Sequence, residues 1–86
     1  MRKKILVADD SNTALMMERT LLTKSAYDVV VARDGREAVK QALEENPDLI
    51  ILDVVMPCMD GFEACRELRR LEATRAIPVI MVTTRS

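Results

Sequence analysis

Three aspartates and one threonine could together carry out phosphoryl chemistry. Asp9 and Asp10 follow the apolar run KKILVA, Asp53 lies inside the apolar run LIILDVVM, and Thr83 follows VIMV. An ionised carboxylate among apolar neighbours is costly unless something compensates it, so Asp53 needs an explanation. Asp53 follows Asp10 by 43 residues and precedes Thr83 by 30 residues, so only the fold can bring these groups together.

The chemistry of clustered carboxylates points to a bound cation. Two carboxylates about 4–5 Å apart repel each other by roughly 3–4 kcal/mol at an effective dielectric constant near 20. A divalent cation with oxygen ligands relieves this repulsion, and Mg²⁺ prefers one or two carboxylates with waters and phosphate oxygens. An aspartate can also be the nucleophile that carries a phosphoryl group. The sequence favours Asp53 as nucleophile, because it stands alone, and the pair Asp9 and Asp10 as metal-holding groups.

The composition is that of one globular domain. The 86 residues are 49% hydrophobic and 31% charged, and the net charge of −1 comes from 13 basic and 14 acidic residues. This balance gives no broad attraction to nucleic acid or to a membrane surface, and no apolar run reaches the ~20 residues of a membrane span. Histidine is absent, which excludes His-based catalytic triads. Cys58 and Cys65 are expected to be reduced thiols, and the domain is expected to be cytoplasmic.

Hydrophobic periodicity predicts strands that alternate with helices. The expected strands cover 3–8, 27–32, 48–56 and 79–84, and the expected helices cover 11–24, 36–45 and 62–74. Alternation of this kind is typical of the α/β class with a parallel sheet, whose crossovers are right-handed. We expect the strand order 2-1-3-4, with the first helix on one face and the other two on the opposite face. Ligands of such sheets bind beyond the carboxyl ends of the strands, where the order reverses. The three aspartates and Thr83 should therefore meet at that rim.

The same periodicity predicts which side chains face inward. On the first helix, Ala14, Met17 and Leu21 form an apolar stripe. Leu15 and Met16 fall off that stripe, so we expect them to add exposed apolar area beside the acidic pair, or else to pack under a missing helix or lie singly exposed. On the second helix, Ala38, Ala42 and Leu43 are expected to face inward.

The chain resembles the receiver domains of two-component response regulators over all 86 residues. The resemblance rests on ILVADDS, on LIILDVVMPCMDGFE and on IPVIMVTT at their mutual spacing. It implies the flavodoxin-like doubly wound fold. It also implies a cytoplasmic phosphoprotein that takes a phosphoryl group from a sensor histidine kinase in the presence of Mg²⁺. Such a domain assists its own phosphorylation and dephosphorylation but is not a turnover enzyme.

The resemblance also implies a role for each matching residue. Asp53 corresponds to the phosphoacceptor and Thr83 to the hydroxyl that turns toward the phosphoryl group. Asp10 corresponds to a direct Mg²⁺ ligand together with Asp53, Asp9 acts largely through water, and Val55 would supply a backbone carbonyl. Two further matches lie in the loop after the acceptor: Pro57 and Gly61, where Gly61 would permit a backbone geometry that other residues resist. The exposed Leu15 and Met16 would contribute to docking of the kinase.

Other interpretations of the same residues exist. A strand-end aspartate such as Asp10 often caps the following helix, Thr83 could be an ordinary strand residue, and Asp53 could belong to a satisfied polar network. Phosphatases of the haloacid dehalogenase type also use an aspartate and Mg²⁺. They need a second aspartate two residues after the first, and Val55 stands there.

Parts of the receiver pattern have no match in residues 1–86, so we expect an incomplete domain that lacks the fifth strand and the last two helices. The lysine that contacts the phosphoryl group in the family cannot be assigned. Arg85 is the one cation placed near the rim; it is either a replacement for that lysine or, as the sequence favours, a solvated terminal arginine. The strand at 79–84 would be an open apolar edge, which favours pairing with another chain. The alternative function is therefore a phosphorylation-incompetent module that self-associates through this strand or through the uncovered face of the sheet.

Overall fold

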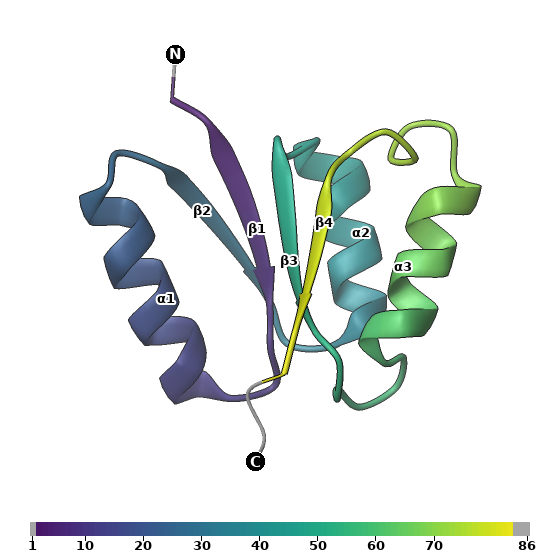
Figure 1. Ribbon diagram of the computed structural model, residues 1–86, viewed down its shortest axis with the longest axis horizontal. Coiled ribbons are helices and arrows are strands. Elements are labelled where there is room, and N and C mark those ends of the chain that lie inside the picture. Colours follow the sequence, from purple (N-terminus) through teal and green to yellow (C-terminus); the bar gives the residue numbers. More distant parts are fainter. Residues whose placement is uncertain (1, 84–86) are drawn as a thin grey trace.

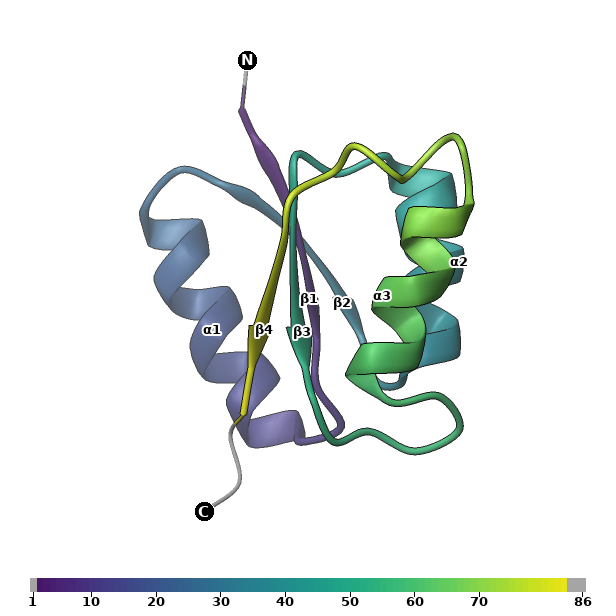
Figure 2. The ribbon, with the colours of Figure 1, turned by 45° about the vertical axis from the view of Figure 1, so that its right-hand side comes forward.

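The computed structural model describes residues 2–83, which form a four-stranded parallel sheet with helices on both faces. The strand order is β2-β1-β3-β4, as predicted. Figures 1 and 2 show α1 on one face and α2 and α3 on the other. The elements are β1 (Lys4–Ala8), α1 (Asn12–Lys24), β2 (Asp28–Ala32), α2 (Gly35–Glu45), β3 (Leu49–Asp53), α3 (Gly61–Arg70) and β4 (Val79–Val82).

Side-chain caps fix the start of each helix. The Ser11 hydroxyl accepts a hydrogen bond from the N–H of Ala14, which makes Ser11 the N-cap of α1. Asp34 and Asp60 do the same for α2 and α3, where each carboxylate accepts from the N–H three residues further on at 2.8 Å. These caps satisfy backbone donors that the helix leaves unpaired, and the two acidic caps also complement the helix dipole. The strand ends that precede α1, α2 and α3 are thereby held at one rim of the sheet.

Two apolar clusters pack the two faces of the sheet. On the side of α2 and α3 the core is made by residues of β1 and β3 and by small residues of the helices: Leu6, Ala8, Ile50, Leu52, Ala38, Ala42, Ala64 and Leu68. The cluster under α1 is smaller and has Ile5, Val7 and Leu15 at its centre. Because successive side chains of a strand alternate between faces, the even-numbered residues of β1 serve one cluster and the odd-numbered ones the other.

Three predicted elements end earlier than expected, and one of them is the fourth strand, which ends at Val82, before Thr83. The third strand ends at Asp53 and not at residue 56, because the chain turns away into the loop that leads to α3. The third helix ends at Arg70 and not at residue 74. There the buried Thr74 hydroxyl donates to the Leu68 carbonyl at 2.7 Å, so a side chain takes the place of a further helical hydrogen bond.

The predicted inward stripe of α1 was wrong. Met17 and Leu21 are 61% and 65% exposed, whereas Leu15 is only 5% exposed. The helix packs on β2 and β1, and the side chains that face them are Leu15 and Leu22. Leu43 of α2 is also exposed, while Ala38 and Ala42 are buried as predicted. On α1, apolar residues occur on more than one side of the helix, so tertiary packing decided which of them face the sheet.

One face of β4 carries no helix among the described residues. Ile80 pairs in register with Ile51, whose side chain packs into the α1 cluster, so both lie on the α1 side of the sheet. Ile80 is 49% exposed. Apolar area therefore continues from Ile51 of β3 to Ile80 of β4, whereas α1 packs mainly on β2 and β1. No described helix is both long enough and apolar enough to cross a membrane.

Candidate functional site

The carboxyl ends of β1 and β3 bring three carboxylates together. Asp9 and Asp10 directly follow β1, Asp53 is the last residue of the adjacent β3, and Ala8 pairs with Leu52 in the parallel register. One carboxylate oxygen from each of Asp9, Asp10 and Asp53 lies within 4.8 Å of the other two. Two of these carboxylates are buried: Asp9 is 1% exposed and Asp53 is 0% exposed.

Asp9 is held in place by its backbone and by one of its oxygens. Its N–H donates to the Ala32 carbonyl at 3.0 Å, and its Oδ1 accepts from the Ser11 N–H at 2.9 Å. Its Oδ2 is buried, and no donor among residues 2–83 reaches it. A buried acceptor left without a donor costs roughly 1–3 kcal/mol, and more when it is charged. This oxygen can therefore accept from a group that residues 2–83 do not supply.

The donor set of the cluster fits a hard divalent cation. At 4.8 Å and an effective dielectric constant near 20, each pair of ionised carboxylates repels by about 3–4 kcal/mol. All the side-chain atoms that converge are oxygens, which Mg²⁺ prefers over nitrogen or sulfur. The repulsion, the buried oxygen of Asp9 and the oxygen-only donor set are consistent with a cation at this position.

Glu18 of α1 is a fourth carboxylate that belongs to the electrostatics of the site, and the sequence reasoning missed it. It lies three residues after Leu15 and four before Leu22, on the side of α1 that faces the sheet. Partial burial raises its pKa above 4.5, and the charges of Asp9 and Asp53 raise the pKa further. The sequence does contain a signal for Glu18, because it is a glutamate on the same side of α1 as Leu15 and Leu22. The signal was missed because Ala14, Met17 and Leu21 were predicted to face inward instead.

We expect the protein to be less stable at neutral pH because of Glu18. The folded protein binds the Glu18 proton more tightly than the unfolded chain does, so the free energy of unfolding falls as pH rises from 4.5 through the raised pKa. Glu18→Gln should remove this fall and be more stable than the wild type at pH 7 in metal-free buffer. Urea unfolding between pH 4.5 and 7, beside the exposed control Glu44→Gln, measures the difference. Parallel pH profiles for the wild type and Glu18→Gln would contradict this assignment.

Thr83 lies at the same rim as the aspartates. Val82 pairs with Asp53, and Thr83 is the next residue along the chain and is exposed. The chain continues from Asp53 in contact with this strand, because the Val54 N–H donates to the Val82 carbonyl at 2.8 Å. Arg85, considered above as a replacement for the family's lysine, lies outside the described residues. The lysines lie elsewhere: Lys3 and Lys4 at the amino end of β1, Lys24 at the end of α1 and Lys40 on α2.

Gly61 is required for a close contact and not for an unusual backbone angle. No described glycine has a positive φ, so the expectation of a special backbone geometry at Gly61 was wrong. A Cβ on Gly61 would lie 2.4 Å from the carbonyl oxygen of Asp53. The Gly61 N–H donates to the Val54 carbonyl at 2.9 Å, which holds the start of α3 against the end of β3. Val55, between these points, has a side chain that is 48% exposed.

Cys58 takes the left-handed conformation in this loop, with φ = 67°. For a residue with a Cβ this conformation costs about 1–2 kcal/mol. Glycine avoids this cost in the folded state, but it also raises the conformational entropy of the unfolded chain, which offsets part of the stabilisation. We expect Cys58→Gly to raise the free energy of unfolding by about 0.5–1 kcal/mol. Cys58→Ala keeps the Cβ and should leave stability near that of the wild type. Equal urea midpoints for the two variants would contradict the proposed strain.

The residues suggested for partner docking separate into one buried and one exposed side chain. Leu15 is buried against Ile5 and Val7, so its assignment to an exposed docking surface was wrong. The physical reason is the rotation of α1, which turns Leu15 toward β1 and β2. Met16 is 70% exposed, as predicted, and remains available to a partner.

Comparison with known proteins identifies the family. The model for the response regulator receiver domain matches residues 5–86. The chain is 45% identical over 85 residues to the alkaline phosphatase synthesis transcriptional regulatory protein PhoP of Bacillus subtilis, covering 99% of this chain and 35% of PhoP. It is 42% identical to Protein PilH of Pseudomonas aeruginosa over 82 residues, covering 95% of this chain and 68% of PilH. The chain thus spans about a third of PhoP and about two thirds of PilH.

Solved structures agree with the sequence relatives. The chemotaxis protein CheY4 of Vibrio cholerae superposes with a TM-score of 0.92 at 37% identity, over 100% of this chain and 72% of CheY4. The receiver domain of the sensor histidine kinase PA1611 from Pseudomonas aeruginosa, described with a magnesium ion coordinated in its active site cleft, gives a TM-score of 0.92 at 31% identity. That alignment covers 96% of this chain and 68% of the PA1611 chain. With its flavodoxin-like fold and its match over nearly the whole chain, the protein belongs to the response regulator receiver domains of two-component systems.

Proposed function

We propose that this protein is a phosphoacceptor and that Asp53 takes a phosphoryl group from the phosphohistidine of a sensor histidine kinase. The observation that carries the proposal is the convergence of the Asp9, Asp10 and Asp53 carboxylates to within 4.8 Å at the rim where the strand order reverses. Residues 1–86 would belong to one receiver domain that works in the cytoplasm without binding nucleic acid or membrane itself.

The acidic cluster would hold Mg²⁺. Asp10, Asp53 and the backbone carbonyl of Val55 are the proposed ligands, and Asp9 would act through a water. The buried Oδ2 of Asp9, which no donor in the described part of the chain reaches, supports this set. When bound, the ion would neutralise charge on the carboxylates and on the incoming phosphoryl group.

The chain's own residues would supply the nucleophile and its orientation. A carboxylate oxygen of Asp53 forms the new bond to phosphorus while the P–N bond of the phosphohistidine breaks, and the electron pair of that bond stays on the departing nitrogen. Burial at the end of β3 fixes the Asp53 side chain, so most of the catalysis is positioning. The Thr83 hydroxyl, one residue past the strand partner of Asp53, would donate to a phosphoryl oxygen. The protein is consumed once per transfer, so it is an acceptor and not a turnover enzyme.

A small phosphoryl donor with a P–N bond tests this function without knowledge of the kinase. We expect phosphoramidate with Mg²⁺ to add one phosphoryl group, measured by intact-protein mass spectrometry. The same mixture with a chelator, or with Asp53→Asn, should show no addition. Phosphorylation of the wild type that is unchanged in Asp53→Asn would contradict the proposal.

A second candidate function is an interaction module that self-associates and is not phosphorylated. The half-exposed Ile80 on the helix-free face of β4 favours it, because a second chain could extend the sheet or cover that face. Sedimentation velocity over a wide concentration range distinguishes the two candidates. A stable dimer that Ile80→Lys dissociates, together with no phosphorylation, would support the module, whereas a monomer at all concentrations would exclude it.

A further inference from the structure

A groove of about 440 Å³ lies between α2 and α3, which Figures 1 and 2 show side by side on one face of the sheet. Val39 and Leu43 of α2 and Met59 of the loop before α3 form its apolar part. Val39 and Met59 are half-buried and pack against the core, whereas Leu43 is 48% exposed. The groove therefore holds apolar area that a partner could cover.

Charged side chains of both signs border this groove. Arg36 and Lys40 lie toward the start of α2 and Glu44 toward its end, and all three are exposed. Glu67 of α3 also lines the groove, but it already forms an ion pair with Arg70. None of the ion pairs between described residues involves Lys40 or Glu44. Both side chains can therefore pair with charges of a partner.

The spacing of these residues along α2 makes the groove complementary in charge to itself. Lys40 and Glu44 are one helical turn apart, and Leu43 lies on the same side of the helix. When two identical helices lie antiparallel about a two-fold axis beside Leu43, Lys40 of one faces Glu44 of the other. The symmetry repeats this contact on the other side of the axis, where the roles of the two copies are exchanged. The two Leu43 side chains then meet at the axis.

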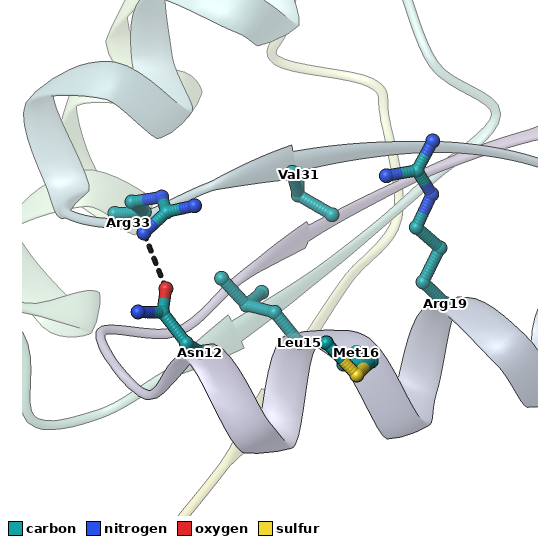
Figure 3. A pocket seen from close by; sticks show the side chains of 6 residues that line it. All are labelled: Asn12, Leu15, Met16, Arg19, Val31 and Arg33. Atoms are coloured by element: carbon teal, nitrogen blue, oxygen red, sulfur yellow. Dashed lines mark hydrogen bonds between the residues drawn. The ribbon is translucent and has the colours of Figure 1, made fainter.

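A cavity on the opposite face of the sheet lacks this property. It lies between α1 and β2, has a volume of about 340 Å³, and carries the guanidinium groups of Arg19 and Arg33 at its two ends (Figure 3). None of the residues that line it is acidic. A second copy would bring like charges together there, so charge complementarity favours self-association at the groove between α2 and α3.

We propose that the groove between α2 and α3 binds the same groove of a second copy of this chain. Two reciprocal ion pairs between Lys40 and Glu44 would flank a contact between the two Leu43 side chains. Such an interface is small, so the dimer is weak, with a dissociation constant on the order of 0.1 mM. It is therefore dissociated at the low micromolar concentrations of an unfolding experiment. The proposal uses a different surface from β4 and does not depend on phosphorylation of Asp53.

Charge reversal followed by mixing tests this pairing. Sedimentation equilibrium of the whole protein at concentrations up to about 1 mM measures the dissociation constant. We expect Lys40→Glu and Glu44→Lys, each alone, to weaken self-association at least about tenfold, because like charges then face each other at both contacts. An equimolar mixture of the two variants should associate about as strongly as the wild type, because each contact again joins opposite charges. Higher salt should weaken the association of the wild type and of the mixture.

Control variants separate this groove from other surfaces. Lys24→Glu makes the same charge change at the end of α1 and should alter the dissociation constant less than about twofold. Ile80→Lys changes the helix-free face of β4 and should also leave this association unchanged. Circular dichroism of each variant shows whether it is folded, so that a loss of association can be assigned to the interface.

Three results would overturn the proposal. The first is a wild-type protein that stays monomeric up to about 1 mM. The second is self-association of folded Lys40→Glu and Glu44→Lys that equals the wild type, or a mixture of the two that associates no better than either alone. The third is association that Ile80→Lys abolishes, which would place the contact on β4.

Discussion

Gly35→Ala is expected to lower the free energy of unfolding by about 3 kcal/mol or more, or to prevent folding. A Cβ on Gly35 would lie 2.0 Å from the carbonyl oxygen of Met59 and 2.7 Å from its carbonyl carbon. Both atoms belong to the backbone, so no side-chain rotation relieves the contact. The Gly35 N–H also donates to the Met59 carbonyl at 2.9 Å, and the clash would break this link between α2 and the loop after Asp53.

The sign of this effect distinguishes packing from helix propensity. Gly35 is the first residue of α2, and alanine is the better helix former by up to about 1 kcal/mol. Propensity alone would therefore make Gly35→Ala more stable. Urea unfolding followed by circular dichroism measures the difference, with Arg36→Ala on the same helical turn as the control, which should stay within about 0.5 kcal/mol. A Gly35→Ala variant as stable as the wild type would contradict the close contact.

Asp9→Asn is expected to make the metal-free protein more stable and to reduce its response to Mg²⁺. The substitution removes one of three charges whose oxygens lie within 4.8 Å. Each pair contributes about 3–4 kcal/mol of repulsion at an effective dielectric constant near 20, and solvent and structural relaxation offset part of it, so a net gain of about 2 kcal/mol is expected. The amide can also donate a hydrogen bond from the position of Asp9 Oδ2, for which residues 2–83 provide no donor.

Mg²⁺ should reverse the order of stability. A ligand at one hundred times its dissociation constant adds about 2.7 kcal/mol to the folded state, and the wild type should gain this fully. Asp9→Asn should bind Mg²⁺ at least about tenfold more weakly and gain little at the same concentration. Thermal unfolding with and without Mg²⁺ measures both effects, with the exposed Glu72→Gln as control. If Mg²⁺ stabilises Asp9→Asn as much as the wild type, the acidic cluster is not the metal site.

Much of this fold was predictable because its signals are local and agree with one another. The strand order followed from alternating strands and helices with right-handed crossovers. The same topology brought Asp9, Asp10 and Asp53 to one rim, although 43 residues separate Asp10 from Asp53. The topology alone places the carboxyl ends of parallel strands at one edge of the sheet. The sequence pattern was therefore sufficient to predict that these aspartates lie close together.

The features that were missed depend on tertiary contacts. The first helix has apolar residues at 14, 15, 16, 17, 21 and 22, so its pattern allows more than one inward face. Packing on β1 and β2 selected Leu15 and Leu22, which brought Glu18 toward the site and exposed Met17. The close approach at Gly61 is likewise a contact between segments, and a one-dimensional pattern does not show it.

The central claim is that Asp53, and no other carboxylate of the cluster, carries the phosphoryl group. Borohydride reduces an aspartyl phosphate to homoserine, which marks the modified residue permanently. After treatment with phosphoramidate and Mg²⁺, peptide mass spectrometry should find homoserine at position 53 and aspartate at positions 9, 10 and 60. Homoserine at position 9 or 10 with aspartate intact at 53, or no homoserine in a protein that circular dichroism shows to be folded, would contradict the account.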